Sequence, residues 1–212
     1  MGYMSAVNAT EAYINTMKMG KRDNEPDVAE FISAIAAGNN AQFMVIACAS
    51  TAGLTTSYLI EAIHQTGGRL ICIVKGDEEL QSSKQALINS NMNQIEFVVG
   101  NAQSLLSNEY KSADFVVIDC DLDNHVRIIE SVQIEREKST IVLGFNAFWK
   151  DSWLWSKTNS RLLPIGEGLL LMRVAGKCKN GGRRNGGGGG GRRSRWVVEV
   201  DECTGEEHVF RM

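Results

Sequence analysis

The sequence has few prolines and no long apolar run, and both absences narrow the class of protein. Two prolines occur among 212 residues. No run of about 18 uncharged apolar residues is present, which argues against a membrane-spanning helix. Residues 1–10 lack a basic segment followed by an apolar stretch, so we expect no secretory signal. With 43% hydrophobic residues we expect a soluble globular protein in the cytoplasm, with the nucleus as the alternative.

Cysteine and histidine spacing gives no metal or disulfide pattern. The five cysteines include no CxxC pair, and Cys48, Cys72 and Cys120 lie in or beside apolar runs. We therefore interpret these three as core residues in a reducing compartment. The three histidines have no Cys or His neighbour at ligand spacing, so zinc is not expected. Hydrolase, phosphate-loop and NAD motifs are also missing from the sequence.

Basic residues are concentrated near the C-terminal end, although the net charge is −3. Between Lys177 and Arg195 there are seven basic residues, many glycines and no acid. This composition predicts a flexible linker. The alternative is that the loop contacts the phosphates of RNA or acts as a nuclear address.

Five continuous apolar runs alternate with segments of helical period. The runs are Phe43–Cys48, Leu70–Val74, Glu96–Val99, Phe115–Ile118 and Thr140–Phe145. Helices are predicted at Thr10–Lys18, Asp27–Ala37, from Leu54 to Gly67-Gly68, at Gln81–Ser90 and at Asn124–Val132. This alternation predicts a parallel sheet covered on both faces, with small molecules binding beyond the carboxyl ends of the strands.

Two further strand pairs are predicted after the last of these runs. Arg161–Val174 contains two apolar strands joined at Gly166-Glu167-Gly168, and Trp196–Val200 with Glu207–Phe210 flanks a Thr-Gly turn. Three tryptophans precede the first pair. Trp149, Trp153 and Trp155 either stack on an aromatic or nucleobase ligand or pack over the sheet edge.

Five segments resemble the caffeoyl-CoA-type and catechol-type O-methyltransferases, which are class I enzymes dependent on S-adenosylmethionine (SAM). The matching segments are VIACASTAGLTTSYLIEAI (45–63), GGRLICIV (67–74), IEFVVGNAQ (95–103), DFVVIDCD (114–121) and LLPIGEGLLLMR (162–173). The segments EAYINTM and GEEHVF and the basic loop also resemble a plant family described only as methyltransferase-like.

The resemblance implies a Rossmann-like methyltransferase fold. This fold is α/β, with a mostly parallel seven-stranded sheet, helices on both faces and an antiparallel hairpin at one edge. We expect the methyltransferase-like domain over residues 1–174, the basic glycine-rich loop over 175–195, and a C-terminal hairpin over 196–212 that packs on the domain.

The resemblance also implies a cofactor site, in which several family residues are replaced. The family's Glu-x-Gly-x-x-x-Gly loop corresponds to Ala47, Ala49 and Gly53, and the acid that holds the ribose corresponds to Val74. Alanine cannot accept the hydrogen bond of the cofactor's ammonium, so we expect SAM to bind weakly, if it is the ligand at all. The candidate cofactor-binding residues are Ser50, Thr51, Gly53, Asp77, Gly100, Asn101, Ala102 and Asp119.

The catalytic positions differ from the family pattern as well. A metal-binding aspartate of relatives corresponds to Phe145, and a lysine that assists deprotonation corresponds to Leu122. Mg²⁺ requires oxygen ligands, so no metal is expected, with Asp119 and Asn146 as the weak candidates for a site. Asp119 and Asp121 are the weak candidates for a catalytic base.

Three functions stay open at this point. The first is a methyltransferase-like protein with degraded metal and cofactor sites that binds SAM or a related nucleoside at the strand tips. The second is a non-catalytic interaction or regulatory module. The third is a metal-independent methyltransferase that acts on an unknown acceptor. The acceptor and the oligomeric state are not indicated by the sequence.

Overall fold

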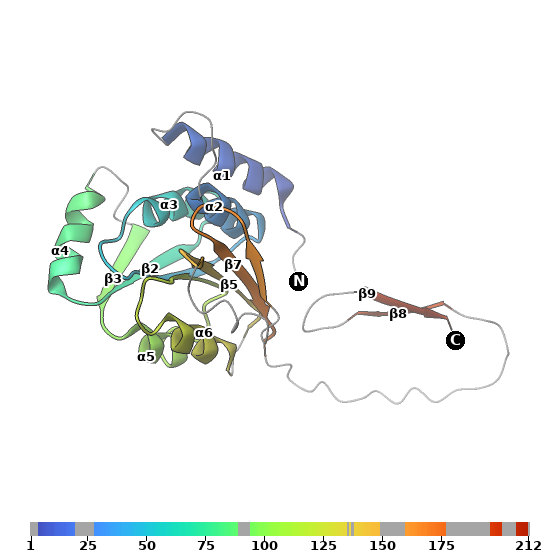
Figure 1. Ribbon diagram of the computed structural model, residues 1–212. Helices are drawn as coiled ribbons and strands as arrows, with labels where there is room; N and C mark the ends of the chain where they lie inside the picture. The colour runs from blue at the N-terminus through green and yellow to red at the C-terminus, as the bar shows by residue number, and fades with distance from the viewer. Residues whose placement is uncertain are drawn as a thin grey trace.

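A seven-stranded sheet with the order β3-β2-β1-β4-β5-β7-β6 organises the computed structural model (Figure 1). The structure describes residues 4–19, 28–88, 94–134, 136, 138–148, 160–176, 196–200 and 207–211. The five parallel strands are β1 (Phe43–Ala47), β2 (Arg69–Val74), β3 (Ile95–Val99), β4 (Phe115–Asp119) and β5 (Thr140–Phe145). They confirm the five predicted strands to within one residue at each end.

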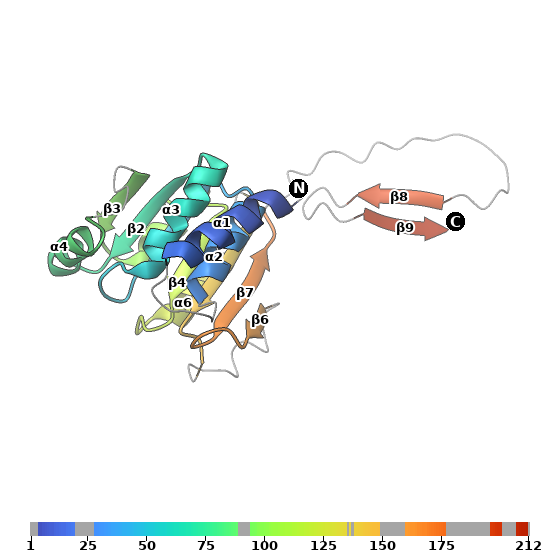
Figure 2. The same cartoon turned by 90° about the horizontal axis from the view of Figure 1, so that it is seen from above.

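Helices cover both faces of this sheet, as expected for a parallel arrangement. The helices are α1 (Ala6–Met19), α2 (Val28–Gly38), α3 (Leu54–Thr66), α4 (Asp77–Ala86), α5 (Ala102–Ser107) and α6 (His125–Gln133). Figure 2 shows α1, α2 and α3 lying over one face, and Figure 1 shows α5 and α6 on the opposite face. Helix α4 lies at the edge of the sheet and contacts β2 and β3.

The unbroken apolar strands form two cores, because alternate side chains point to opposite faces of the sheet. Met44 and Ile46 of β1 belong to the core beneath α1, α2 and α3. Val45 and Ala47 belong to the core beneath α5 and α6. All four are fully buried, and burying a side chain of the size of Met44, Val45 or Ile46 stabilises the fold by about 1.5–3 kcal/mol.

An antiparallel hairpin completes the sheet at the β5 edge. Strand β6 (Ser160–Leu163) pairs with β7 (Leu169–Val174), which pairs in turn with β5. Gly168 in the turn has a φ of 91°, and a Cβ atom at this position would lie 2.6 Å from the backbone nitrogen of Phe148. Glycine is therefore required at this position for two separate steric reasons. The hairpin predicted from Arg161–Val174 is confirmed.

Gly38 has a packing role at the end of α2. Gly38 is the last residue of α2, and the left-handed residue that follows the helix is Asn40, with a φ of 53°. A Cβ atom on Gly38 would lie 3.0 Å from the Cβ of Ala9 in α1. The glycine thus permits close packing of α1 on α2, a tertiary contact that the local sequence does not indicate.

Two helices also differ from the prediction. Helix α4 begins at Asp77 rather than at Gln81, so the acidic residues Asp77, Glu78 and Glu79 form its first turn. Negative charge at a helix N-terminus is favourable because of the helix dipole. Helix α5 was not predicted. Its six residues make fewer than two helical turns, which is too short to show a hydrophobic period.

A separate two-stranded sheet is formed by β8 (Trp196–Val200) and β9 (Glu207–Arg211), which confirms the pairing predicted for this segment. Its packing on the domain stays a prediction. The basic segment from Lys177 to Arg195 lies outside the described residues. Within the described part of the chain, no helix combines the length and the apolar character needed to cross a bilayer.

Candidate functional site

A cavity of about 350 Å³ lies at the carboxyl ends of the strands. We call it the strand-tip cavity, and its wall comes from the end of β2 and from segments that follow β1, β2, β3 and β4. The residues that line it are Cys48, Ile73, Val74, Lys75, Gly100, Asn101, Ala102, Leu122 and Asn124. The strand order reverses between the parallel neighbours β1 and β4, and such switch points are where open α/β sheets form ligand clefts. The sequence predicted that small molecules bind beyond the carboxyl ends of the strands, and the cavity lies at that edge of the sheet.

The two positions that the resemblance matches to acidic anchors of the O-methyltransferases are apolar and buried. Ala47 ends β1 with an exposed fraction of 0%, and Val74 ends β2 with 1%. Each belongs to one of the two cores, so neither position offers an acceptor to a ligand ammonium or to ribose hydroxyls. The residues present do not fit the cationic amino-acid part of SAM.

The loop after β1 is held by backbone and serine contacts. The Ala52 amide donates to Oγ of Ser83 at 2.8 Å, and the Ser83 hydroxyl donates to the carbonyl of Glu79 in α4. Ser50, Thr51 and Gly53 are exposed, and the structure does not place them in the cavity wall. Their predicted contact with a cofactor stays a prediction.

Sequence reasoning missed Ser83, since a lone serine in a polar helix carries no local signal. This side chain is fully buried. It acts as a positioning residue, because it ties α4 to the loop that precedes α3.

The segment after β3 enters the cavity as the sequence predicts. The Gly100 amide donates to the carbonyl of Val74 at 3.0 Å, which joins the tips of β2 and β3. Asn101 caps α5, since its Oδ1 accepts from the Ser104 amide at 3.0 Å. With Oδ1 engaged in this way, the Nδ2 group is what Asn101 can offer to a ligand. Ala102 follows as the first residue of α5 and is 8% exposed.

Asp119 is the hub of the hydrogen bonds that join β1, β4 and β5. Its carboxylate accepts from the amide of Ala49 at 3.2 Å, from the amide of Asp121 at 3.0 Å and from Nδ2 of Asn146 at 3.1 Å. The Asp119 side chain is 8% exposed. These three donors come from segments up to 70 residues away, so Asp119 stabilises the relative positions of the strand tips.

Asn146 adopts a left-handed backbone conformation, with a φ of 57°, which asparagine tolerates better than most residues. This conformation allows its Nδ2 to donate to both Asp119 and Asp121, at 3.1 and 3.0 Å. Two carboxylates that would otherwise repel each other are thus joined by one amide.

This arrangement does not fit a divalent metal. Asn146 turns its amide nitrogen toward the carboxylates, whereas Mg²⁺ or Ca²⁺ would need its oxygen. Phe145 packs against the core, and Leu122 is 4% exposed. Within the part of the chain that the structure describes, no group of three His, Cys, Asp or Glu side chains is placed to hold a metal.

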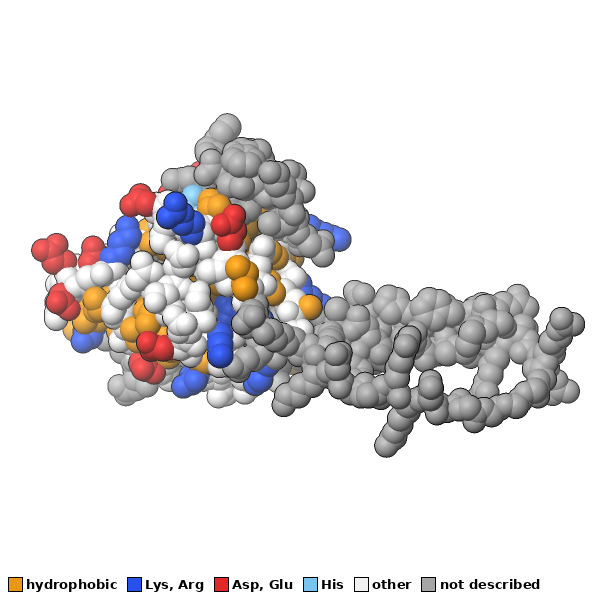
Figure 3. All heavy atoms as spheres, turned by 90° about the horizontal axis from the view of Figure 1, so that it is seen from below, with side chains coloured by type: hydrophobic (Ala, Val, Ile, Leu, Met, Phe, Trp, Pro, Cys, Tyr) orange, Lys and Arg blue, Asp and Glu red, His pale blue; other side chains and the backbone are white. Residues whose placement is uncertain are grey.

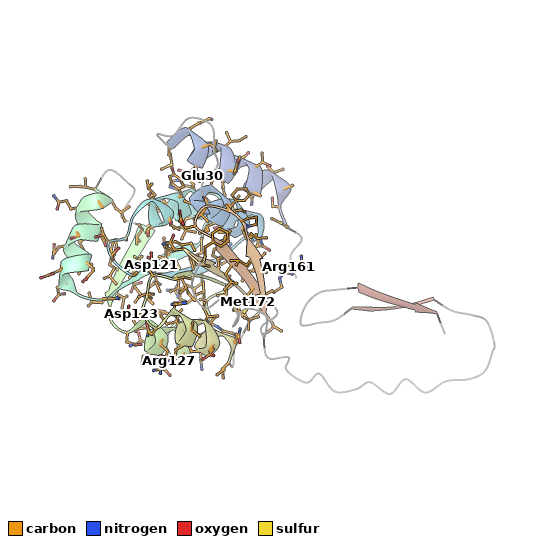
Figure 4. All side chains as sticks on the ribbon, in the orientation of Figure 1. Glu30, Asp121, Asp123, Arg127, Arg161 and Met172 are labelled. Carbon is orange, nitrogen blue, oxygen red and sulfur yellow. The ribbon has the colours of Figure 1, made fainter. Side chains whose placement is uncertain are left out.

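Lys75 lines the cavity, although the sequence did not single it out as a candidate site residue. It follows β2 directly, and its Nζ lies 3.9 Å from Oδ2 of Asp123, with the two side chains 46% and 99% exposed. Asp121 and Asp123 belong to the segment between β4 and α6 and are labelled in Figure 4. The sequence feature that could have indicated Lys75 was a single basic residue directly after an apolar strand. Asp77, a candidate cofactor-binding residue, is exposed in the first turn of α4 and outside the cavity wall.

A pair of thiols lies behind the cavity wall. Sγ of Cys48 is 3.8 Å from Sγ of Cys72, and both side chains are buried. The hydrogen bond with Cys48 and burial raise the pKa of the Cys72 thiol above its ordinary value. Cys72 is therefore held in its neutral form, which agrees with the predicted core role of these cysteines.

Trp149, Trp153 and Trp155 lie outside the described residues, as does most of the basic loop.

A family model described as "Protein of unknown function (DUF1442)" matches residues 3–212. No curated protein matches the sequence. Among solved structures, a methyltransferase from Geobacter sulfurreducens is similar, with a TM-score of 0.59 and 15% identity over 77% of this chain and 88% of that one.

Two further solved structures are similar to this chain. A candidate caffeoyl-CoA O-methyltransferase from Staphylococcus aureus gives a TM-score of 0.56 and 16% identity, covering 80% of this chain and 92% of that one. An O-methyltransferase from Bacillus cereus, solved with S-adenosylhomocysteine (SAH), gives 0.55 and 16%, covering 80% and 91%. At this identity the likeness establishes the fold, which is the Rossmann-like methyltransferase fold that the sequence predicts.

Proposed function

Because the chain belongs to the DUF1442 family, whose description names no activity, we propose a function from the chain's own residues. The protein binds a nucleoside-type ligand in the strand-tip cavity and does not catalyse metal-dependent O-methylation.

The observation that carries this proposal is the position of the cavity. It opens at the switch point between β1 and β4, where doubly wound α/β sheets hold their ligands. Its volume of about 350 Å³ lies within the range of small-molecule sites. Asn101 and Asn124 provide amide groups in the wall, while Ile73 and Leu122 provide apolar surface for a base or a ribose.

A structural neighbour supports the choice of ligand class. The Bacillus cereus O-methyltransferase was solved with SAH, which contains adenosine. The match between that fold and this one, together with a cavity at the strand tips, favours a nucleoside over an unrelated metabolite.

The second half of the proposal rests on Asp119 and Asn146. A carboxylate that already accepts three hydrogen bonds is poorly placed to bind a metal as well. Metal-assisted deprotonation of a catechol would also need an anionic ligand at position 145 and a base at position 122, where the chain has phenylalanine and leucine. A regulatory or interaction module that uses this scaffold without a ligand is the rival function.

The charges on one face of the molecule favour a small ligand over nucleic acid on that face. On the face shown in Figure 3, acidic and basic side chains are interspersed among apolar ones. A nucleic-acid surface would gather basic residues on one face.

Isothermal titration calorimetry with adenosine, SAH and SAM tests the proposal. We expect binding of at least one of these, and loss of that binding in Asn101→Trp, whose indole fills the cavity. Asn108→Trp, at the exposed far end of α5, is the matched control and keeps binding. If no binding is detected up to millimolar ligand, the result supports a regulatory or interaction module without a ligand. Metal-stimulated methyl transfer to a catechol would contradict the proposal.

A further inference from the structure

The charge of the strand-tip cavity indicates which kind of nucleoside it accepts. Building on the proposed nucleoside site, we infer that the ligand is a nucleotide that carries phosphate, and that Lys75 binds this phosphate.

The cavity wall offers a cation and no anion to a ligand. Among the described residues that line it, Lys75 is the one with a charged side chain, and its neighbours in the wall are amides, a thiol and aliphatic groups. A charge that faces a partly enclosed cavity interacts more strongly with a ligand than one in open solvent. The complementary ligand group is therefore negative.

This charge disfavours SAM. That molecule carries a sulfonium and an ammonium cation, and its carboxylate is its single anionic group. The acids that pair with the cofactor's polar groups in related enzymes correspond to Ala47 and Val74, which are 0% and 1% exposed. A cationic ligand would thus lose its attractive partners and meet the repulsion of Lys75. A phosphate would meet attraction instead, since lysine is a common phosphate-binding residue.

Lys75 is available to change partners. Its ion pair with Asp123 is long, at 3.9 Å, and the Asp123 side chain is 99% exposed. Exposed pairs of this kind contribute little, because water and salt screen them. An anionic ligand oxygen at a shorter distance would displace Asp123 at small cost.

Helix α6 adds to the positive potential of the same wall. Asn124 lines the cavity and is the N-cap of α6, which runs for nine residues from His125 to Gln133. The N-terminus of a helix carries partial positive charge and favours anions. The lysine and the helix end act in the same direction on a phosphate.

The experiment compares nucleosides with their 5′-monophosphates. Adenosine, guanosine, cytidine and uridine are titrated against the full-length protein beside AMP, GMP, CMP, UMP, SAM and inorganic phosphate, at one fixed ionic strength. We expect one monophosphate to bind at least roughly tenfold more tightly than its nucleoside and than SAM, and to weaken as salt is raised. Phosphate alone should bind more weakly than that nucleotide, because it lacks the base and ribose contacts. Equal affinity for free phosphate would overturn the nucleotide assignment.

Three variants test the role of Lys75. Lys75→Gln should lower the affinity for the monophosphate roughly tenfold, to that of the nucleoside, and leave nucleoside binding unchanged. Lys84→Gln, which removes one positive charge from the last turn of α4 and outside the cavity wall, is the matched control and should bind like the wild type. Asp123→Asn should strengthen monophosphate binding by about twofold, because Lys75 loses a competing anion.

The outcomes separate this inference from the proposed function. Nucleosides that bind as tightly as their monophosphates, or SAM that binds more tightly than either, would overturn the phosphate assignment and leave the nucleoside site standing. A monophosphate preference that survives Lys75→Gln would overturn the role of Lys75. If none of these compounds binds, both the nucleoside site and the phosphate assignment are overturned.

Discussion

At the scale of single residues, Asp119 shows how a side chain of a methyltransferase-type motif can serve the fold itself. Its carboxylate joins the tips of β1, β4 and β5 through Ala49, Asp121 and Asn146. A buried carboxylate that accepts hydrogen bonds stabilises a structure, because its removal leaves the donors unsatisfied. We therefore assign Asp119 a positioning role at the strand tips.

Asp119→Ala should lower the free energy of unfolding by about 2 kcal/mol or more, since three donors lose a charged acceptor. Urea denaturation followed by circular dichroism measures this change. Asp123→Ala removes a carboxylate that is 99% exposed and should leave stability unchanged. Equal stability of the two variants would show that the Asp119 network contributes nothing to the fold.

Cys72 predicts a dependence of stability on pH. Its pKa in the folded protein lies above the unfolded value, so above roughly pH 8.5 the unfolded chain binds fewer protons than the folded one. The free energy of unfolding should therefore fall as pH rises past this point, by about 1.4 kcal/mol per pH unit for this thiol.

Cys72→Ala tests this dependence in denaturation curves between pH 7 and 10. Its slope above pH 8.5 should be shallower than that of the wild type by the contribution of one thiol. An unchanged slope would mean that the Cys72 thiol ionises alike in the folded and unfolded chains.

At the scale of secondary structure elements, the antiparallel hairpin depends on one glycine. Gly168 combines a positive φ of 91° with a 2.6 Å approach of its would-be Cβ to the Phe148 backbone. The nearby strands β5, β6 and β7 share a ladder of hydrogen bonds, so strain in this turn acts on the edge of the whole sheet.

Gly168→Ala should destabilise the protein by at least about 2 kcal/mol, because strained backbone and a steric clash add. Gly53→Ala is the control, since a Cβ atom there meets its nearest neighbour at 3.9 Å. That change should cost less than about 1 kcal/mol, the usual effect at a helix N-cap. Melting temperatures of the two variants give the comparison, and a larger loss for Gly53→Ala would contradict it.

At the scale of the whole molecule, the seven-stranded sheet is complete at Val174, the last residue of β7. Both cores are built from residues between Ala12 and Val174. The remaining strands, β8 and β9, form a sheet of their own. We therefore expect residues 175–195 to contribute little to stability.

Deletion of Lys177–Arg195 should leave the melting temperature within a few degrees of that of the wild type, as measured by differential scanning calorimetry. Replacing the seven basic residues of this segment by glutamine is the control that removes charge without shortening the chain. A collapse of the melting transition in the deletion alone would show that the segment is more than a linker.

Much of the fold could be predicted because each core strand is an unbroken apolar run. Residues 44–47 and 115–119 are buried on both faces, so the same local pattern indicates a strand and its place within a parallel sheet. Helix α5 was missed because a helix of six residues shows no period. The order of the motifs at the strand ends likewise predicted a ligand site at this edge of the sheet, where the strand-tip cavity lies.

The sequence by itself determined the fold class, because unbroken apolar runs indicate the strands of a parallel sheet. Its resemblance to O-methyltransferases implied that Ala47, Val74 and Phe145 replace acidic residues of that family. Only the tertiary structure decided the partners of Asp119, the close contact at Gly38 and the place of Lys75 in the cavity wall. Such contacts join segments far apart in the chain. They depend on strand order and register, which a local pattern of apolar residues does not encode.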